Sequence, residues 1–354
     1  MHVAGRSAAG QGPNNTNFQK DIHMGHQTKT KTTRNTIAAA VAVAIGAVPV
    51  AHADIELGTG LSVAGFADMS IYNFNPDGDG DGEGGGGNNI TSAGIDQFEM
   101  DFKFAGANGI SAQVDIEYGE GFEGSDDETF VEQAFITKAF NEQFSMKVGR
   151  FLSYSGWEAE EPTGLFQYSG SGYAPYFYGY YQNGVSAFYD GGKVDFMASV
   201  VTSAFNPNDR DAEDLGYELG VAITPIEGLT AKAFYIKDED SDSEIVNAWV
   251  SYSAKGFTLA GEYNTADYAG GADGDGFLVM GNYAAGKFGI TLRYVDFEIK
   301  DGFGDPTLKT SSITLSPSYK ASDNLLIVAE VRQDNVDVGG PDATSFALEA
   351  LFTF

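Results

Sequence analysis

From Asp54 to its last residue the chain is a succession of segments in which apolar and polar residues alternate, and no helical period of useful length occurs. The segments are about 8 to 12 residues long, and the gaps between them are alternately short and long. Each short gap carries Gly, Asn, Asp or Pro, which supply the backbone angles of tight turns. The short gaps are 105–109, 140–143, 190–192, 224–228, 254–256, 285–287 and 321–324.

The long gaps are mostly acidic and rich in glycine, and they fall between the short ones: 75–89, 119–128, 152–183, 205–214, 238–244, 266–276, 300–309 and 335–342. Counting the segments between all gaps predicts sixteen strands, within a range of about 12 to 18. Several strands have one apolar and one polar face, such as 97–104, 111–118 and 312–319. Segment 129–138 mixes both kinds of residue on both faces, so its orientation is ambiguous.

An alternating antiparallel sheet fits a soluble sandwich or barrel, or a membrane barrel whose apolar face is outside. The polar faces here carry charges and small residues, as a water-filled lumen requires. Tight turns alternate with long loops, which two rims of different character would produce. An even strand number lets the sheet close without an edge. The sequence therefore predicts an all-β, transmembrane, antiparallel up-and-down β-barrel.

The beginning of the chain has the pattern of a signal peptide. Lys29, Lys31 and Arg34 form a basic region, 37–50 is a short apolar stretch, and residues 51–53 read Ala-His-Ala, a cleavage signal. The apolar stretch is too short to span a membrane. We therefore expect an upstream extension over 1–23 that reflects a start codon placed too early, a cleaved signal peptide over 24–53 and a barrel over 54–354.

Composition excludes several classes of function. The chain has no cysteine, and its four histidines all precede Asp54, so 54–354 lacks the usual base of lipases and proteases. The formal net charge is -30, which argues against nucleic acid as a partner. The sequence from Asp54 onward contains 49 acidic and 15 basic residues. We expect neither an enzyme nor a cofactor.

The chain ends in the strand Phe346 to Phe354, in which every second residue is apolar. With the signal peptide and the alternating strands, this ending resembles Gram-negative outer-membrane porins. The resemblance implies an outer-membrane location in contact with lipid, and passive diffusion of small hydrophilic solutes and ions. It also implies that the barrel-assembly machinery reads Phe352 and Phe354. Porins are often trimers, although no interface of a homotrimer is identifiable in the sequence.

Residues 147–189 contain the longest gap, with a Gly/Glu/Pro stretch followed by an aromatic run. This region resembles the OmpL-like family of β-barrel porins. In porins such a loop often folds into the lumen, so the resemblance implies a constriction. Its candidate residues are Arg150 at the base, with Trp157, Glu158, Glu160 and Glu161. A solvated external loop is an equal alternative, and for the tyrosines at 173–181 we favour an aromatic girdle at the membrane interface over a sugar-stacking slide.

Assigning the polar strand faces to the lumen predicts inward acids in excess of inward bases. The acids are Glu99, Asp101, Asp115, Glu117, Glu218, Glu262, Glu330 and Glu349; the bases are Lys103, Lys232, Arg293 and Arg332. Acidic rings favour cations. We therefore expect a weakly cation-selective pore, and a plugged structural or adhesive barrel that displays acidic loops is the alternative.

Asp77, Asp79 and Asp81 match the start of a calcium-binding loop, in which carboxylates alternate along the chain. The bidentate Glu that such a loop requires at its twelfth position is replaced by Asn88. These residues are a weak Ca²⁺ candidate, and a flexible acidic loop is the favoured interpretation.

Overall fold

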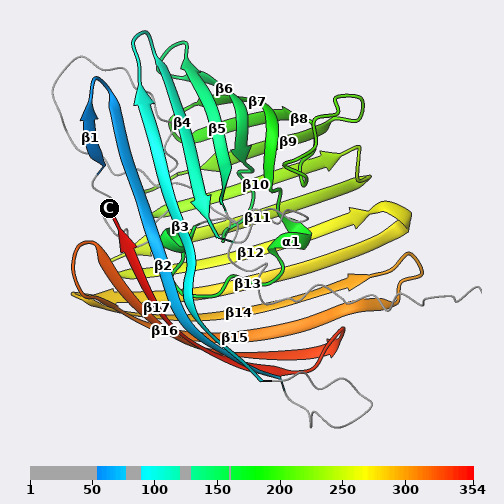
Figure 1. Cartoon of the computed structure of the whole chain (residues 1–354). Coiled ribbons are helices and arrows are strands. Elements are labelled where there is room, and N and C mark those ends of the chain that lie inside the picture. The colour runs from blue at the N-terminus through cyan, green and yellow to red at the C-terminus, as the bar shows by residue number, and fades with distance from the viewer. Residues whose placement is uncertain (1–53, 77–88, 120–128, 159–160) are drawn as a thin grey trace, which may run out of the picture.

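Sixteen antiparallel strands form a closed barrel in the computed structural model, which describes residues 54–76, 89–119, 129–158 and 161–354 (Figure 1). Each strand pairs with the next in the chain, and β17 pairs with β2 to close the sheet. The predicted architecture and the strand number are thus confirmed. The strands are β2 Leu61–Pro76, β3 Ile90–Ala105, β4 Ile110–Tyr118, β5 Thr129–Ala139, β6 Phe144–Leu152, β7 Tyr181–Asp190, β8 Val194–Val201, β9 Gly216–Ile223, β10 Leu229–Asp238, β11 Ser243–Ala254, β12 Phe257–Tyr268, β13 Ala272–Ala285, β14 Phe288–Lys300, β15 Pro306–Lys320, β16 Leu325–Val338 and β17 Ala343–Thr353.

A short additional strand, β1 (Ile55–Gly58), precedes the barrel and folds back on the start of β2 as a hairpin. The alternating pattern of the sequence does not separate β1 from the first barrel strand. The expected signal peptide and upstream extension lie outside the described residues and stay predictions.

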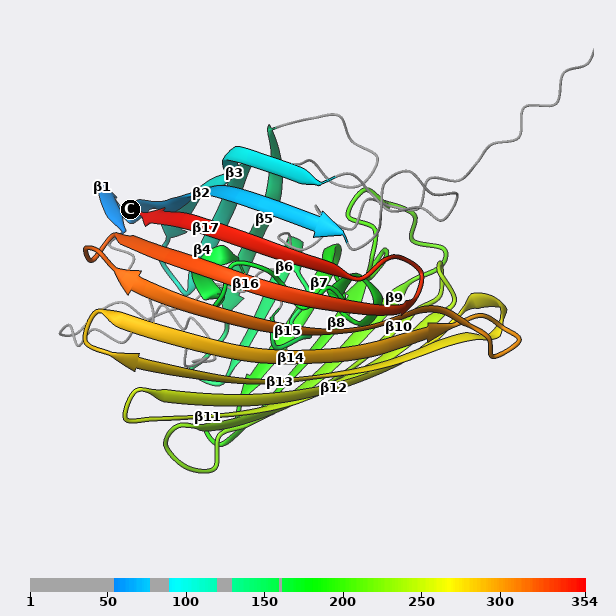
Figure 2. The same ribbon diagram turned by 90° about the horizontal axis from the view of Figure 1, so that it is seen from below.

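The tight turns gather at one end of the barrel, and the longer connections lie at the other (Figure 2). The turn between β11 and β12 shows why such turns need particular residues. Lys255 and Gly256 both have positive φ, at 52° and 83°, a combination that matches the right-handed twist of the two flanking strands. This geometry keeps neighbouring strands in register from the turn onward.

The outer surface of the barrel is apolar and the inner one is largely polar, the reverse of a soluble protein. On β13 and β14, Val279 and Leu292 are 50% and 53% exposed, whereas Arg293, the chain neighbour of Leu292, is completely buried. Paired aromatic rings stand on the outer surface near the tight turns, including Phe257 with Tyr283 at 4.3 Å between centroids. An aromatic girdle of this kind marks a membrane interface.

The last residue is part of the barrel seam. The backbone N–H and C=O of Phe354 each hydrogen-bond to Gly65 on β2, at 3.0 Å. The centroid of the Phe354 ring lies 6.2 Å from that of the Phe98 ring. A Cβ at position 65 would lie only 2.8 Å from the Phe354 ring. The terminal aromatic therefore packs where a larger residue on β2 would not fit.

The connection between β6 and β7 is the longest described segment outside the strands, and it contains two short helices, η1 (Pro162–Gly164) and α1 (Ala174–Phe177). We call the segment 153–180 the inner loop. No helix among the described residues is long and apolar enough to cross a membrane.

Candidate functional site

The inner loop lies within the barrel, because its backbone hydrogen-bonds to side chains on the inner faces of several strands. Trp157 N–H donates to Glu262 on β12 at 2.7 Å, and Ser169 N–H donates to Glu330 on β16 at 3.1 Å. Two further N–H groups of the loop donate to Glu218 on β9 and Asn247 on β11, both at 3.0 Å. Of the two placements considered from the sequence, the inward one is therefore observed.

The aromatic run of the inner loop packs against an apolar patch inside the barrel. Tyr173 and Phe177 have no exposed surface, and both rings make edge contacts with Phe297 on β14. The inner faces of β10, β11 and β13 add Ile236, Ile245, Trp249 and Leu278 to this cluster. The preferred interpretation of the run as an interfacial girdle is thus wrong, because these strands offer the rings an apolar surface within the lumen.

One carboxylate accepts hydrogen bonds from the hydroxyl groups of two of these aromatic residues. The hydroxyl groups of Tyr173 and Tyr178 both donate to Oε2 of Glu262, and Asn247 donates to its Oε1 at 2.6 Å. Burial raises the pKa of both tyrosines well above the usual value, so the hydroxyls keep their protons and act as donors. Glu262 thereby holds the inner loop at three points, counting Trp157 N–H.

Trp157 and Trp249, the only two tryptophans of the chain, meet where the loop touches the wall. Their rings contact edge to face at 5.3 Å between centroids, and both are nearly inaccessible, at 4% and 3% exposure. The ammonium of Lys232 lies 5.0 Å from the Trp249 ring, within the range of a cation–π contact.

Two inward arginines clamp the middle of the loop. Arg293 is fully buried and donates to both carboxylate oxygens of Glu158, at 3.0 and 2.9 Å. It also donates to the backbone oxygens of Ser169 and Gly170, at 2.7 and 3.1 Å. Arg332 donates to the same Gly170 oxygen at 2.7 Å and to Asp334 at 2.7 Å. The guanidinium groups on this wall are therefore engaged with the loop and with a neighbouring acid.

Arg150, the candidate for the base of the constriction, contacts the backbone of two other segments. Its guanidinium donates to the backbone oxygens of Val131, at 3.1 Å, and of Pro207, at 2.7 Å, and thus joins β6 to the connection that follows β8. Glu160, and the calcium candidates Asp77, Asp79 and Asp81, lie outside the described residues.

The side chains assigned to the lumen from strand parity lie on the inner side of the barrel. Ten are buried, and the other two, Asp101 and Lys103, are partly exposed and joined by a salt bridge of 3.0 Å. The buried ones are Glu99, Asp115, Glu117, Glu218, Lys232, Glu262, Arg293, Glu330, Arg332 and Glu349.

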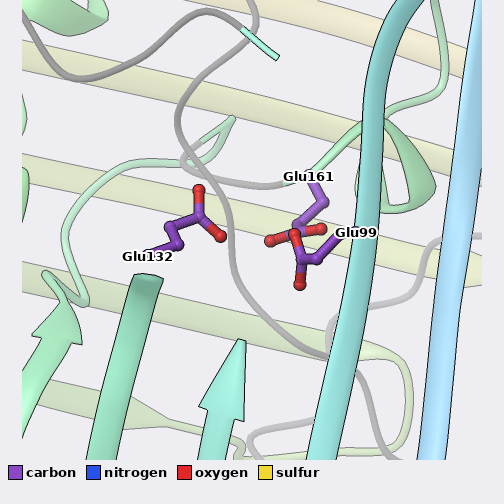
Figure 3. A group of neighbouring side chains, drawn as sticks. All are labelled: Glu99, Glu132 and Glu161. Atoms are coloured by element: carbon purple, nitrogen blue, oxygen red, sulfur yellow. The ribbon is translucent and has the colours of Figure 1, made fainter. Parts of the chain in front are cut away.

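An acidic cluster lies on the side of the barrel that β3 to β5 form. Glu99 on β3, Glu132 on β5 and Glu161 of the inner loop place carboxylate oxygens within 4.8 Å of one another (Figure 3). Burial and the neighbouring charge of Glu132 raise the pKa of Glu161 well above its usual range. Asp101 and Asp115 form a second group with Glu99.

Glu132 was missed from the sequence, and the register explains why. On β4, Asp115 pairs with Gln133 and the next residue, Ile116, pairs with Val131. Glu132 is thus the extra residue of a β-bulge, where two residues oppose one and strict alternation fails. The mixed faces of segment 129–138 were the available signal of this bulge.

Comparisons with known proteins agree with this architecture. A sequence model of the family described as Gram-negative porin matches residues 38–339. Among solved structures, the anion-selective porin of Comamonas acidovorans is similar at 13% identity and TM-score 0.62, over 83% of this chain and 99% of that one.

OmpF of Salmonella typhi, in complex with daunomycin, is similar at 14% identity and TM-score 0.62, over 85% of this chain and 100% of that one. The trimer form of OmpT from Vibrio cholerae is similar at 14% identity and TM-score 0.59, over 83% of this chain and 100% of that one. A search of the curated proteins finds no match. The chain belongs to the Gram-negative porin family and is an outer-membrane β-barrel channel protein.

Proposed function

We propose that this porin lets small hydrophilic solutes and ions diffuse passively across the outer membrane, with a weak preference for cations. The inner loop is the constriction, with Trp157, Glu158 and Glu161 on its described part. Glu160, in the same acidic stretch, and Arg150, which precedes the loop on β6, are further constriction candidates. Selectivity arises from pore width and charge, so transport needs no catalytic group.

The uneven distribution of charge inside the barrel carries this proposal. Arg293 and Arg332 hold the loop and are compensated by Glu158 and Asp334. On β3, β4 and β5 the inward carboxylates outnumber the inward bases. Lys103 lies beside Asp101, and the ammonium of Lys147 on β6 lies 4.1 Å from the centre of the Phe135 ring. The excess of carboxylates on these strands makes the electrostatic potential in the lumen negative, which favours cations.

Reversal potentials in planar bilayers test the proposal. Residues 54–354, refolded and inserted under a KCl gradient, should show single-channel steps and a potential of the sign that K⁺ preference produces. Replacing Glu99 and Asp115 together by Gln and Asn should reduce this preference, whereas Glu227→Gln, at an exposed turn, should leave it unchanged. Anion preference in the unaltered protein would refute the charge argument.

The tight packing of the inner loop favours one second candidate, a plugged barrel that acts as a structural or adhesive protein through its acidic loops. A folded barrel without any conductance would support that function. We further propose contact with membrane lipid, assembly by the barrel-assembly machinery through Phe352 and Phe354, and a homotrimer. Chemical cross-linking in membranes tests the last, with a three-chain product expected.

A further inference from the structure

We propose that Glu99, Glu132 and Glu161 form a binding site for one divalent cation, with Ca²⁺ the best fit, and that the bound ion fastens the inner loop to the barrel wall. Two of these ligands come from the wall strands β3 and β5, and the third comes from the loop directly before η1. All three carboxyl groups point toward a common space (Figure 3).

Two buried oxygens in this space lack hydrogen-bond partners. Oε2 of Glu99 and Oε2 of Glu132 receive no hydrogen bond from any of the described residues. Their side chains are 3% and 1% exposed, so bulk water does not supply the missing donors. A buried carboxylate oxygen without a donor is costly, and a cation held between the carboxylates removes that cost.

The backbone places Glu132 in the cluster by a specific device. Because Glu132 is the extra residue of the β4–β5 bulge, both it and Gln133 turn toward the interior. Gln133 donates to Asp115 at 2.8 Å and accepts from Leu152 N–H at 3.0 Å, which leaves Glu132 as an additional inward carboxylate. Bulges commonly redirect a side chain beside a functional site.

The donor set and its size indicate which ion binds. Carboxylate oxygens suit hard cations such as Ca²⁺ and Mg²⁺. Two oxygens on opposite sides of one ion lie about 4.6 to 5.2 Å apart for Ca²⁺ but about 4.0 to 4.2 Å for Mg²⁺, twice the metal–oxygen distance. The oxygens of this cluster lie within 4.8 Å of one another, a spread that a single Ca²⁺ can bridge.

The neighbouring acidic group, Glu99 with Asp101 and Asp115, is a poorer candidate. Asp101 already forms a salt bridge with Lys103 at 3.0 Å. Both oxygens of Asp115 accept hydrogen bonds from Gln113, at 3.0 and 2.9 Å. These donors offset the charges that a metal ion would otherwise neutralise.

Calorimetric titration of CaCl₂ into residues 54–354, refolded in detergent and freed of metal with a chelator, tests the site directly. We expect one saturable Ca²⁺ per chain and weaker binding of Mg²⁺. Glu132→Gln and Glu99→Gln should each lower the Ca²⁺ affinity at least about tenfold, because affinity depends on the number of charged ligands. Glu349→Gln, which changes an equally buried inward glutamate on β17, should keep the affinity within about twofold, because the charge of the ligand set is unchanged.

The triple variant Asp77→Asn/Asp79→Asn/Asp81→Asn separates the inner site from the acidic sequence between β2 and β3. Unchanged affinity in that variant supports the inner site, and loss of the single Ca²⁺ overturns it. Equal binding by the unaltered protein and Glu132→Gln, or no saturable binding at all, also overturns the proposal.

The consequence for transport rests on the proposed pore, whereas the titration does not. With a conducting pore, Ca²⁺ should lower the K⁺ preference of the unaltered protein and leave that of Glu132→Gln unchanged. Ca²⁺ binding by a barrel that does not conduct would retain the site and reject the pore.

Discussion

Replacement of Arg293 by Met should release the inner loop from the β14 wall while the barrel stays closed. Arg293 joins Glu158, Ser169 and Gly170 of the loop to Thr314 of β15 through six hydrogen bonds. Its side chain has no exposed surface. Met occupies a similar length but offers no donor, so the Glu158 carboxylate is left buried without its counter-charge.

Removal of one partner from a buried ion pair typically costs about 3 to 5 kcal/mol. If undocking of the loop alone accounts for this cost, the equilibrium constant for docking falls by between about a hundredfold and a few thousandfold, at about 1.4 kcal/mol per factor of ten. The strand pairings of β14 involve backbone groups only, so the sheet keeps its hydrogen bonds. The loss is therefore local to the loop.

Tryptophan fluorescence reports this local change, because Trp157 lies on the loop and Trp249 on the wall. In Arg293→Met we expect red-shifted emission, faster quenching by acrylamide and a larger single-channel conductance. The double variant Arg293→Met/Glu158→Gln should recover part of the docking, since the isolated charge is gone. Lys309→Met, a partly exposed base on β15, is the control. Unchanged emission and conductance in Arg293→Met would refute the clamp.

Three further changes probe the loop and the seam. Gly156→Ala should undock the loop, because φ is +91° and the new Cβ would lie 2.4 Å from the Tyr178 ring; red-shifted emission checks this. Glu262→Gln should lower the free energy of unfolding by about 1 to 3 kcal/mol, because Oε2 of Glu262 accepts hydrogen bonds from Tyr173 and Tyr178. Denaturant titration followed by the same fluorescence measures this loss. Deletion of Phe354 should slow barrel closure, and the folded fraction seen as a heat-sensitive band in electrophoresis checks it.

Strand number and inward side chains were predictable because they depend on a period of two and on turn residues. On β14, the alternation of Leu292 and Arg293 is visible in the sequence and recurs in the barrel. Alternation failed at Glu132, where one inserted residue shifts the pattern. It also did not reveal the apolar patch around Leu278 and Phe297, since both faces of a strand look apolar when a loop covers the inner one.

The placement of the loop depended on contacts between residues far apart in the sequence. Glu158 meets Arg293 across 135 positions, and Ser169 meets Glu330 across 161. No local pattern in the segment 152–183 distinguishes a loop tied to these partners from one in solvent. The resemblance to other porins supplied the inward alternative, and the hydrogen bonds to the wall decided between the two.

The inner loop divides the barrel interior into two walls of different chemistry. Against β9 to β16 it buries apolar side chains and satisfies Arg293 and Arg332, so that wall offers little free charge to a passing ion. Glu161 emerges on the other side of the loop and joins Glu99 and Glu132. The loop thus neutralises Arg293 with Glu158 and adds the acid Glu161 to the β3–β5 side. The proposed cation preference and the proposed divalent-cation site therefore both depend on the same fold of the loop.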